Sequence, residues 1–249
     1  MPIPWGWASV KRIYLAPAST SPQGSCPLLY KPPIRQKERI MNDTIYPKHT
    51  PWGAPQTRRI VVEGIVRYTT GSHGGYWLSP ARVASMPQGL RPAQNLDSDG
   101  GAWLEEDQEW AIVELAFPQH FDSKNQESAQ RLLKDWMPEI WEAWTGEKLT
   151  PETSFTRRRE EFFQKHQNAQ VVTGAFGSWH KLVPKGKIGV VAMTGGRPPN
   201  GMLTAPETYW LVDENEYVEA LKRPANVGYF VVDPTRHRPW PQEALAAAA

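Results

Sequence analysis

The sequence predicts an α+β fold: a mixed or antiparallel sheet, a Trp-rich kinked helix pair in the middle of the chain and a disordered N-terminal arm. Three observations support this. Strand-like segments precede and follow the helical ones instead of alternating with them, prolines crowd the first 40 residues, and tryptophans recur at helical spacing near residue 140. We expect a Pro-rich basic arm over 1–47, a single α+β domain over 48–240 and a flexible Ala-rich tail over 241–249.

The first 40 residues hold seven prolines, and six basic side chains against one acidic side chain. Proline fixes φ and lacks a backbone donor, so the stretch from Pro22 to Pro33 can form neither a helix nor a central strand. A second methionine, Met41, stands where the sequence changes character, so translation from Met1 and translation from Met41 are both open. The positive charge gives the arm a weak, nonspecific affinity for nucleic acid.

The rest of the chain is mildly acidic, with 22 basic and 25 acidic residues. Broad phosphate binding needs a concentrated basic face, so we do not expect it of the domain. No apolar run approaches the roughly 20 residues of a membrane helix, and the N-terminus lacks the charged-then-apolar order of a secretory signal. The single cysteine, Cys26, excludes an internal disulfide framework. We therefore expect a cytoplasmic protein with no membrane partner.

Two segments in the first half of the domain are rich in β-branched and aromatic residues, as strands are. They are 59–69 and 109–117. Between them we expect a short strand at 75–79 and a loop at 87–101, where prolines and glycines recur. Together these segments predict an antiparallel unit.

The helical signal lies at 122–145, where apolar side chains recur at spacings of three and four. Asp122 or Ser123 is the expected cap, and Gly146 the expected stop. Pro138 should kink this helix or divide it in two, because proline removes one backbone donor and crowds the preceding turn.

A second helix is expected directly afterwards, with Thr150 as its cap and Pro151 at its first position. Its basic run at 157–159 is followed by Glu160 and Glu161, which can pair with it. The last third returns to strands at 170–173, 187–193, 207–212 and 228–232, with a short helix near 214–222.

His73 precedes two glycines, and it is the first candidate catalytic residue. An imidazole in this position can approach a ligand closely, because Gly74 and Gly75 have no Cβ, and imidazole suits acid–base work or metal ligation. The commoner alternative is that Gly74 and Gly75 supply positive φ for a hairpin, while His73 bonds the backbone.

A run of three carboxylates, Glu105, Glu106 and Asp107, lies between two tryptophans. On a strand, Glu105 and Asp107 would share one face. With His73 they could form an acid–base set or bind Mg²⁺ or Mn²⁺. A solvated charge run would look the same, and the spacing matches no established metal motif. We therefore expect no cofactor, with Mg²⁺ or Mn²⁺ as the alternative.

The chain holds 12 tryptophans, a residue type enriched both in cores and at protein interfaces. We expect the tryptophans of the kinked helix to pack in the core, and the helix is also a candidate docking surface. The candidate binding residues are Trp77, Trp103, Glu106, Trp136, Trp141, Trp144 and His180.

Several segments, taken together, carry a family resemblance. They are residues 50–53, 72–75, 103–107, 179–186 with 189–190, 195–197, and 209–212 with 216–217. As a set they resemble an uncharacterised domain family that occurs in hypothetical proteins of bacterial plasmids, integrative conjugative elements and phages. The resemblance covers about residues 48–238. It implies that the gene lies among accessory and anti-restriction genes, and it supplies no catalytic residue.

The sequence therefore predicts an accessory protein of a bacterial mobile genetic element, which binds a host protein in an anti-restriction or anti-defence role. The alternative is a metal-dependent hydrolase or nuclease that uses His73 with Glu105 or Asp107. An enzyme needs these groups within reach of one reacting atom, so the distance from His73 to the carboxylates tests the alternative. Neither the partner nor the oligomeric state follows from the sequence.

Overall fold

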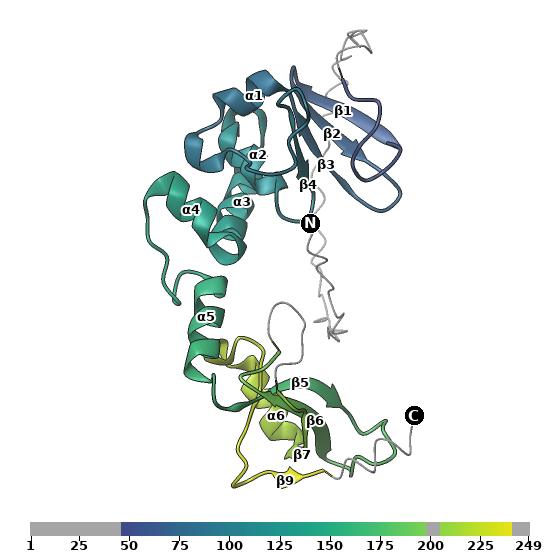
Figure 1. Cartoon of the computed structure of the whole chain (residues 1–249), viewed down its shortest axis with the longest axis vertical. Coiled ribbons are helices and arrows are strands. Elements are labelled where there is room, and N and C mark those ends of the chain that lie inside the picture. The colour runs from purple at the N-terminus through teal and green to yellow at the C-terminus, as the bar shows by residue number, and fades with distance from the viewer. Residues whose placement is uncertain (1–45, 198–204, 241–249) are drawn as a thin grey trace, which may run out of the picture. The chain divides into compact units, whose positions relative to one another are not determined.

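The computed structural model describes residues 46–197 and 205–240, which form six α-helices and two antiparallel sheets (Figure 1). The predicted α+β class is therefore confirmed. Residues 1–45, which hold nearly all of the predicted arm, and the predicted tail lie outside the described residues. No helix in the described part of the chain is long and apolar enough to cross a membrane.

The first sheet contains four strands in chain order: β1 (Thr57–Val62), β2 (Ile65–Thr69), β3 (Gly74–Leu78) and β4 (Ala102–Glu105). The antiparallel unit is as predicted, and β3 lies where a strand was expected. The strand-like segment 59–69 forms strands as expected, but a tight turn at Gly64, with φ +79°, divides it into the two strands of a hairpin. The residues on both sides of that turn favour strands, so propensity alone did not show the break.

Helix α2 (Trp110–Ala116) replaces the strand that was expected at 109–117. Five consecutive residues of this helix, 111–115, are buried, and it contacts β3, β4 and helix α3 (Ser123–Trp136). A short apolar run that is buried on every side has no amphipathic period, so its sequence does not distinguish helix from strand. Packing decided the conformation.

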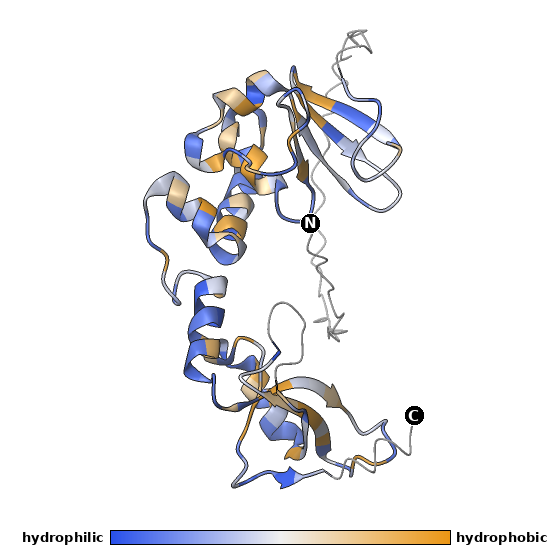
Figure 2. Ribbon diagram, viewed as in Figure 1, coloured by the Kyte–Doolittle hydropathy of each residue, from blue (hydrophilic) through white to orange (hydrophobic). Residues whose placement is uncertain are grey.

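The first core lies between this sheet and the helices next to it. It includes Leu78, Leu104, Val113 and Leu133, all fully buried. Apolar residues are correspondingly concentrated in α2 and in the strands (Figure 2). Helix α1 (Pro80–Ser85) and the 3-10 turn η1 (Gln88–Leu90) occupy the connection to β4, where only a loop and no helix was expected.

The predicted kinked helix is two helices, α3 and α4 (Pro138–Thr145). As expected, Asp122 caps the first helix: its carboxylate accepts a hydrogen bond of 2.8 Å from the backbone N–H of Lys124. Met137, at φ −132° and ψ 53°, leaves the helical region, because the residue before a proline avoids that conformation. Pro138 then begins α4, and Gly146 ends it.

Helix α5 (Phe155–Lys165) begins later than expected, so the predicted cap at Thr150 is wrong. Thr150 instead closes a turn, in which its carbonyl accepts from the backbone N–H groups of Thr153 and Ser154. Ser154, fully buried, is the N-cap. The first N–H of the helix, from Phe155, donates to Asp135 of α3 at 3.0 Å, a tertiary contact that favours the later start.

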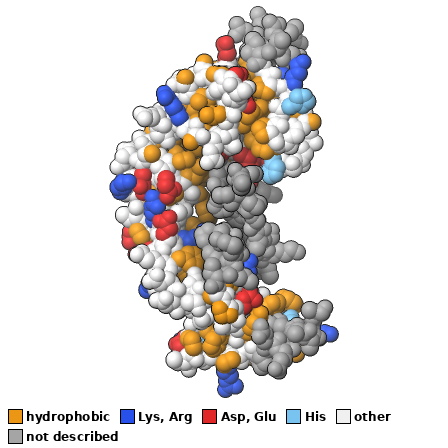
Figure 3. All heavy atoms as spheres, viewed as in Figure 1, with side chains coloured by type: hydrophobic (Ala, Val, Ile, Leu, Met, Phe, Trp, Pro, Cys, Tyr) orange, Lys and Arg blue, Asp and Glu red, His pale blue; other side chains and the backbone are white. Residues whose placement is uncertain are grey.

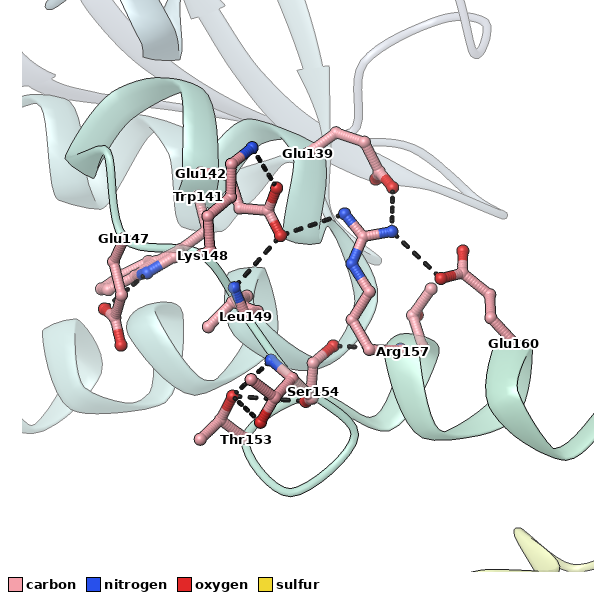
Figure 4. Close-up of polar contacts among 12 residues, drawn as sticks. Glu139, Trp141, Glu142, Glu147, Lys148, Leu149, Thr153, Ser154, Arg157 and Glu160 are labelled. Carbon is pink, nitrogen blue, oxygen red and sulfur yellow. Dashed lines mark hydrogen bonds and ion pairs between the residues drawn. The ribbon is translucent and has the colours of Figure 1, made fainter.

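Arg157 forms ion pairs with three carboxylates and holds the start of α5 against α4 (Figure 4). Its guanidinium lies 3.0 Å from Glu139, 3.1 Å from Glu142 and 3.0 Å from Glu160. Acidic and basic side chains gather on this part of the surface (Figure 3). The predicted pairing of the basic run with Glu160 is present, and most of the contacts are with α4.

Besides its contact with Arg157, the Glu142 carboxylate accepts hydrogen bonds from the Lys148 ammonium and the Leu149 backbone N–H. A hydrogen bond from Lys148 lowers its pKa most, the backbone N–H of Leu149 and the Arg157 guanidinium add to the effect, and together they bring the pKa to about 2. Its side chain is only 11% exposed. Glu142 is therefore ionised at neutral pH, where it joins α4, α5 and the segment between them.

The second sheet has the strand order β8-β5-β6-β7-β9. Its strands are β5 (Gln170–Phe176), β6 (Lys187–Thr194), β7 (Thr208–Asp213), β8 (Val231–Val232) and β9 (Arg238–Pro239). One face packs on helix α6 (Glu214–Lys222), with Val190, Val212 and Ala220 in one buried cluster. The four expected strands and the short helix are present. Strand β9 was not predicted, because two residues carry no periodic signal.

Glu142→Gln is expected to lower the melting temperature at pH 7, because the amide cannot form the same ion pairs. The pKa of Glu142 falls from an ordinary 4.5 to about 2 on folding, so its stabilisation is complete above pH 4.5 and is lost as the pH falls towards 2. The difference in melting temperature between wild type and variant should narrow over that range. Glu139→Gln, at a position 68% exposed, is the control. A constant difference from pH 5 to pH 2.5 would contradict the assignment.

Candidate functional site

A polar cavity of about 230 Å³ lies beside the first sheet. Strands β2 and β3, the turn after β4 and helices α2 and α3 each supply part of its wall. The lining residues are Arg67, Gly75, Tyr76, Glu106, Trp110, Glu114 and Asn125. The fold thus gathers two carboxylates, a guanidinium, a phenol, an amide and an indole around one small space.

Glu114 is the buried acid of this cavity, and only 4% of the residue is exposed. One carboxylate oxygen, Oε1, accepts a hydrogen bond of 3.3 Å from the Tyr76 hydroxyl. The other, Oε2, is buried without a hydrogen-bond partner in the described residues. A buried carboxylate oxygen costs free energy when nothing donates to it. Glu114 is therefore suited to accept from a donor that enters the cavity.

Burial has the largest effect on the pKa values of Glu114 and Tyr76. It raises the pKa of Glu114, while the Tyr76 hydroxyl, the Asn125 amide and the Arg67 guanidinium act in the opposite direction. Burial, reinforced by Glu114, also raises the pKa of Tyr76 to about 12, so its hydroxyl stays a donor at neutral pH. Arg67 is exposed, and none of the ion pairs of the described residues joins it to Glu114.

The structure places His73 beside Glu105, as the catalytic alternative requires. His73 lies in the loop between β2 and β3, and its Nδ1 is 3.5 Å from Glu105 Oε1. The pairing of β3 with β4 causes this proximity, because Gly75 lies opposite Glu105. Burial, with Asp107 as the next contribution, raises the pKa of Glu105, and His73 acts against that rise.

The predicted face shared by Glu105 and Asp107 is not formed, because β4 ends at Glu105. The chain then turns over 106–109, and the Glu109 carboxylate accepts a hydrogen bond of 3.0 Å from the backbone N–H of Glu105. Asp107 is exposed in this turn. Over residues 46–197 and 205–240, no group of three or more His, Cys, Asp and Glu side chains could hold a metal ion.

Gly74 and Gly75 do not supply positive φ, so that interpretation is wrong. Both lie in strand β3 and are buried. A Cβ on Gly75 would collide with the carbonyl oxygen of Leu104 and with the ring of Trp52. The glycines therefore provide space, which lets the neighbouring strand and the Trp52 ring approach β3 closely.

Trp77 and Trp103, two predicted binding residues, face each other across β3 and β4. Both are at least 95% buried, with exposures of 4% and 5%. Their indole N–H groups both donate to the Asp97 carboxylate, each at 2.9 Å. This shared acceptor ties the loop before β4 to the sheet, so both residues have a clear role in the fold.

The tryptophans of the helix pair differ in exposure. Trp136 is 47% exposed and packs against Phe155, with ring centroids 4.8 Å apart and the ring planes tilted by 42°. Trp141 is buried and donates to Glu147 at 2.9 Å, and Trp144 packs against its ring. Of these three residues, Trp136 offers the largest surface to a partner.

The other predicted binding residues lie apart from these. Glu106 lines the cavity, and its backbone N–H donates to Gly74 at 3.0 Å. His180 lies in the loop that joins β5 to β6 of the second sheet, where its ring contacts the rings of Trp179 and Trp240. Tyr76 and Glu114 were missed, although a lone glutamate inside the apolar run 111–116 was a usable signal.

Gly75→Val is expected to destabilise the protein by about 1–3 kcal/mol, because it forces extra atoms into a close-packed strand pair. Urea denaturation measures this. Gly71→Ala is the control, since a Cβ there would meet nothing closer than Gln56 Nε2 at 3.5 Å. If the free energy of unfolding of the valine variant were unchanged, β3 and β4 would be able to move apart at no cost, and the prediction would be wrong.

Glu114→Gln is expected to melt at the same or a higher temperature than wild type at pH 8. The variant can still accept from Tyr76 and carries no buried charge. Because folding raises the pKa of Glu114 above its ordinary 4.5, wild-type stability falls as the pH rises through the interval above 4.5, and the variant lacks this loss. Glu161→Gln, at an exposed position of α5, is the control. A much lower melting temperature for Glu114→Gln would mean that the charge is needed for folding.

Residues 45–167 match a family model described as Domain of unknown function (DUF7007). No curated protein and no solved structure matches the chain. The matched range ends just after α5, so it contains the cavity and the His73–Glu105 pair, while the resembling segments between 179 and 217 lie outside it. Residues 45–167 of this chain are therefore similar to the DUF7007 family, whose function is unknown.

Proposed function

We propose that this protein is an accessory protein of a bacterial mobile genetic element, and that it binds a host protein in an anti-restriction or anti-defence role. The resemblance of several of its segments to hypothetical proteins of plasmids, integrative conjugative elements and phages supports the setting. The observation that carries the binding proposal is the buried Glu114 carboxylate, whose Oε2 lacks a partner on the wall of a cavity.

The chemistry of the cavity favours a basic side chain. A lysine or arginine of the partner would donate to Glu114 Oε2, with Glu106 as a second acceptor, in charge-assisted hydrogen bonds. Its aliphatic stem would pack on the Trp110 ring. The volume of about 230 Å³ is below the roughly 300–1,000 Å³ typical of small-molecule sites. One inserted side chain therefore fits better than a free metabolite.

The test begins with a host protein recovered from lysate on the immobilised protein and then purified. Its dissociation constant should rise at least about tenfold for Glu114→Gln, the loss expected when a charge-assisted bond becomes a neutral one. Glu161→Gln should bind like wild type. In a plasmid-transfer assay with a restricting recipient strain, wild type should protect the incoming plasmid and Glu114→Gln should not. Equal affinity and equal protection in both variants would contradict the proposal.

A second candidate function rests on the 3.5 Å approach of His73 to Glu105. In a hydrolase or nuclease, His73 would act as general base, and Glu105 would orient its ring. Asp107 follows in the adjoining turn, and Mg²⁺ or Mn²⁺ would be the added metal.

This alternative has its own assay. Purified protein would be incubated with single-stranded and duplex DNA, with and without Mg²⁺ or Mn²⁺. Cleavage that is lost in both His73→Ala and Glu105→Gln, while Glu161→Gln stays active, would support it. Cleavage that persists in either site variant would refute it.

A further inference from the structure

The segment that forms β5 and β6 is basic, although the chain after residue 40 is acidic. Residues 162–206 contain five lysines and arginines and no aspartate or glutamate. Three of the lysines, Lys181, Lys185 and Lys187, lie exposed in or next to the loop between β5 and β6. Positive charge is therefore concentrated at one end of the second sheet.

Strand register places further residues on the same sheet face. Phe176 pairs with Gly189, Gly189 with Leu211, and Leu211 with Arg238, so these residues form one row across β5, β6, β7 and β9. Directly opposed residues in antiparallel strands project to the same side. The ring of Trp240 covers Gly189, where a Cβ would collide with it. This face thus combines aromatic rings with a guanidinium.

A cavity of about 490 Å³ opens beside this row, a volume within the roughly 300–1,000 Å³ typical of ligand sites. It is lined by four lysines and arginines and two carboxylates, together with His237, Pro184 and Leu211. Lys187 lies 3.7 Å from Asp213, and Arg236 lies 3.0 Å from Glu216. Lys185 and Arg238 form none of the ion pairs found in the described residues. Two positive charges are therefore left for an anionic ligand.

Trp179 is the most exposed large apolar residue of the described chain, at 74%. It lies in the same loop as Lys185, with its ring centroid 6.1 Å from that of Phe176 and 5.8 Å from that of His180. This exposed indole can stack on a base while Lys185, in the same loop, and Arg238, on β9 of the same sheet, bind the phosphates. This combination is characteristic of single-strand binding surfaces.

We infer that this end of the second sheet binds single-stranded nucleic acid, independently of the partner proposed for the Glu114 cavity. Trp179 stacks on an unpaired base, and Lys185 and Arg238 bind the backbone phosphates. A single strand fits better than a duplex, because the bases of a duplex are already stacked and the chain after residue 40 has more acidic than basic residues. DNA and RNA share this chemistry.

Fluorescence anisotropy of the full-length protein with labelled oligo(dT) and oligo(U) tests the inference and distinguishes the two strands. Trp179→Ala should weaken binding by about 5- to 100-fold, the effect of removing one stacked base. The double variant Lys185→Gln/Arg238→Gln should reduce the slope of log K against log [salt] by about 1.4, because two phosphate contacts are lost. Lys124→Gln and Arg131→Gln, at exposed positions of α3, should bind like wild type.

Three results would overturn the inference. In the first, neither oligonucleotide binds at low salt. In the second, the site variants bind as tightly as the α3 controls, so that the contacts lie elsewhere in the chain. In the third, the protein binds vesicles of phosphatidylserine and phosphatidylcholine through Trp179 and does not bind the oligonucleotides, which would make the exposed tryptophan a membrane contact.

Discussion

The burial of α2 between the first sheet and α3 is the constraint on which the structure of residues 46–167 depends. Its apolar residues fill the core, and the same packing carries Glu114 into an environment where a charge is costly. The neighbouring Tyr76 hydroxyl satisfies only one carboxylate oxygen. A stable core and an unsatisfied polar group thus arise from one helix, and such a group is where a binding function is most readily placed.

The close packing of β3 against β4 and the Trp52 ring is a second feature of this region. Gly75 admits the Trp52 ring, and the carboxylate of Asp97 accepts from two facing indoles. These contacts fix how β3 and β4 lie against each other, and therefore the distance between His73 and Glu105. The aromatic residues that made the segment look like a binding surface largely hold the sheet together.

Charged residues of one sign are clustered in separate parts of the chain, and the net charge of the whole chain does not show this. The cavity beside α2 has two carboxylates and one guanidinium. The segment 162–206, which contains β5 and β6 of the second sheet, has no acidic residue. Because screening in salt limits the reach of surface charges to roughly 10 Å, each ligand responds to its own neighbourhood. One chain can accordingly present an acidic site and a basic one.

Local signals determined much of the fold. The cap at Asp122, the break at Pro138 and the stop at Gly146 follow from neighbouring residues alone, so the sequence predicts them directly. Tertiary contacts decided the rest. Residues 109–117 became a helix because burial on all sides removes the period that separates helix from strand. Likewise, His73 meets Glu105 only through the register of β3 with β4, and a contact between residues that far apart in the sequence depends on strand pairing.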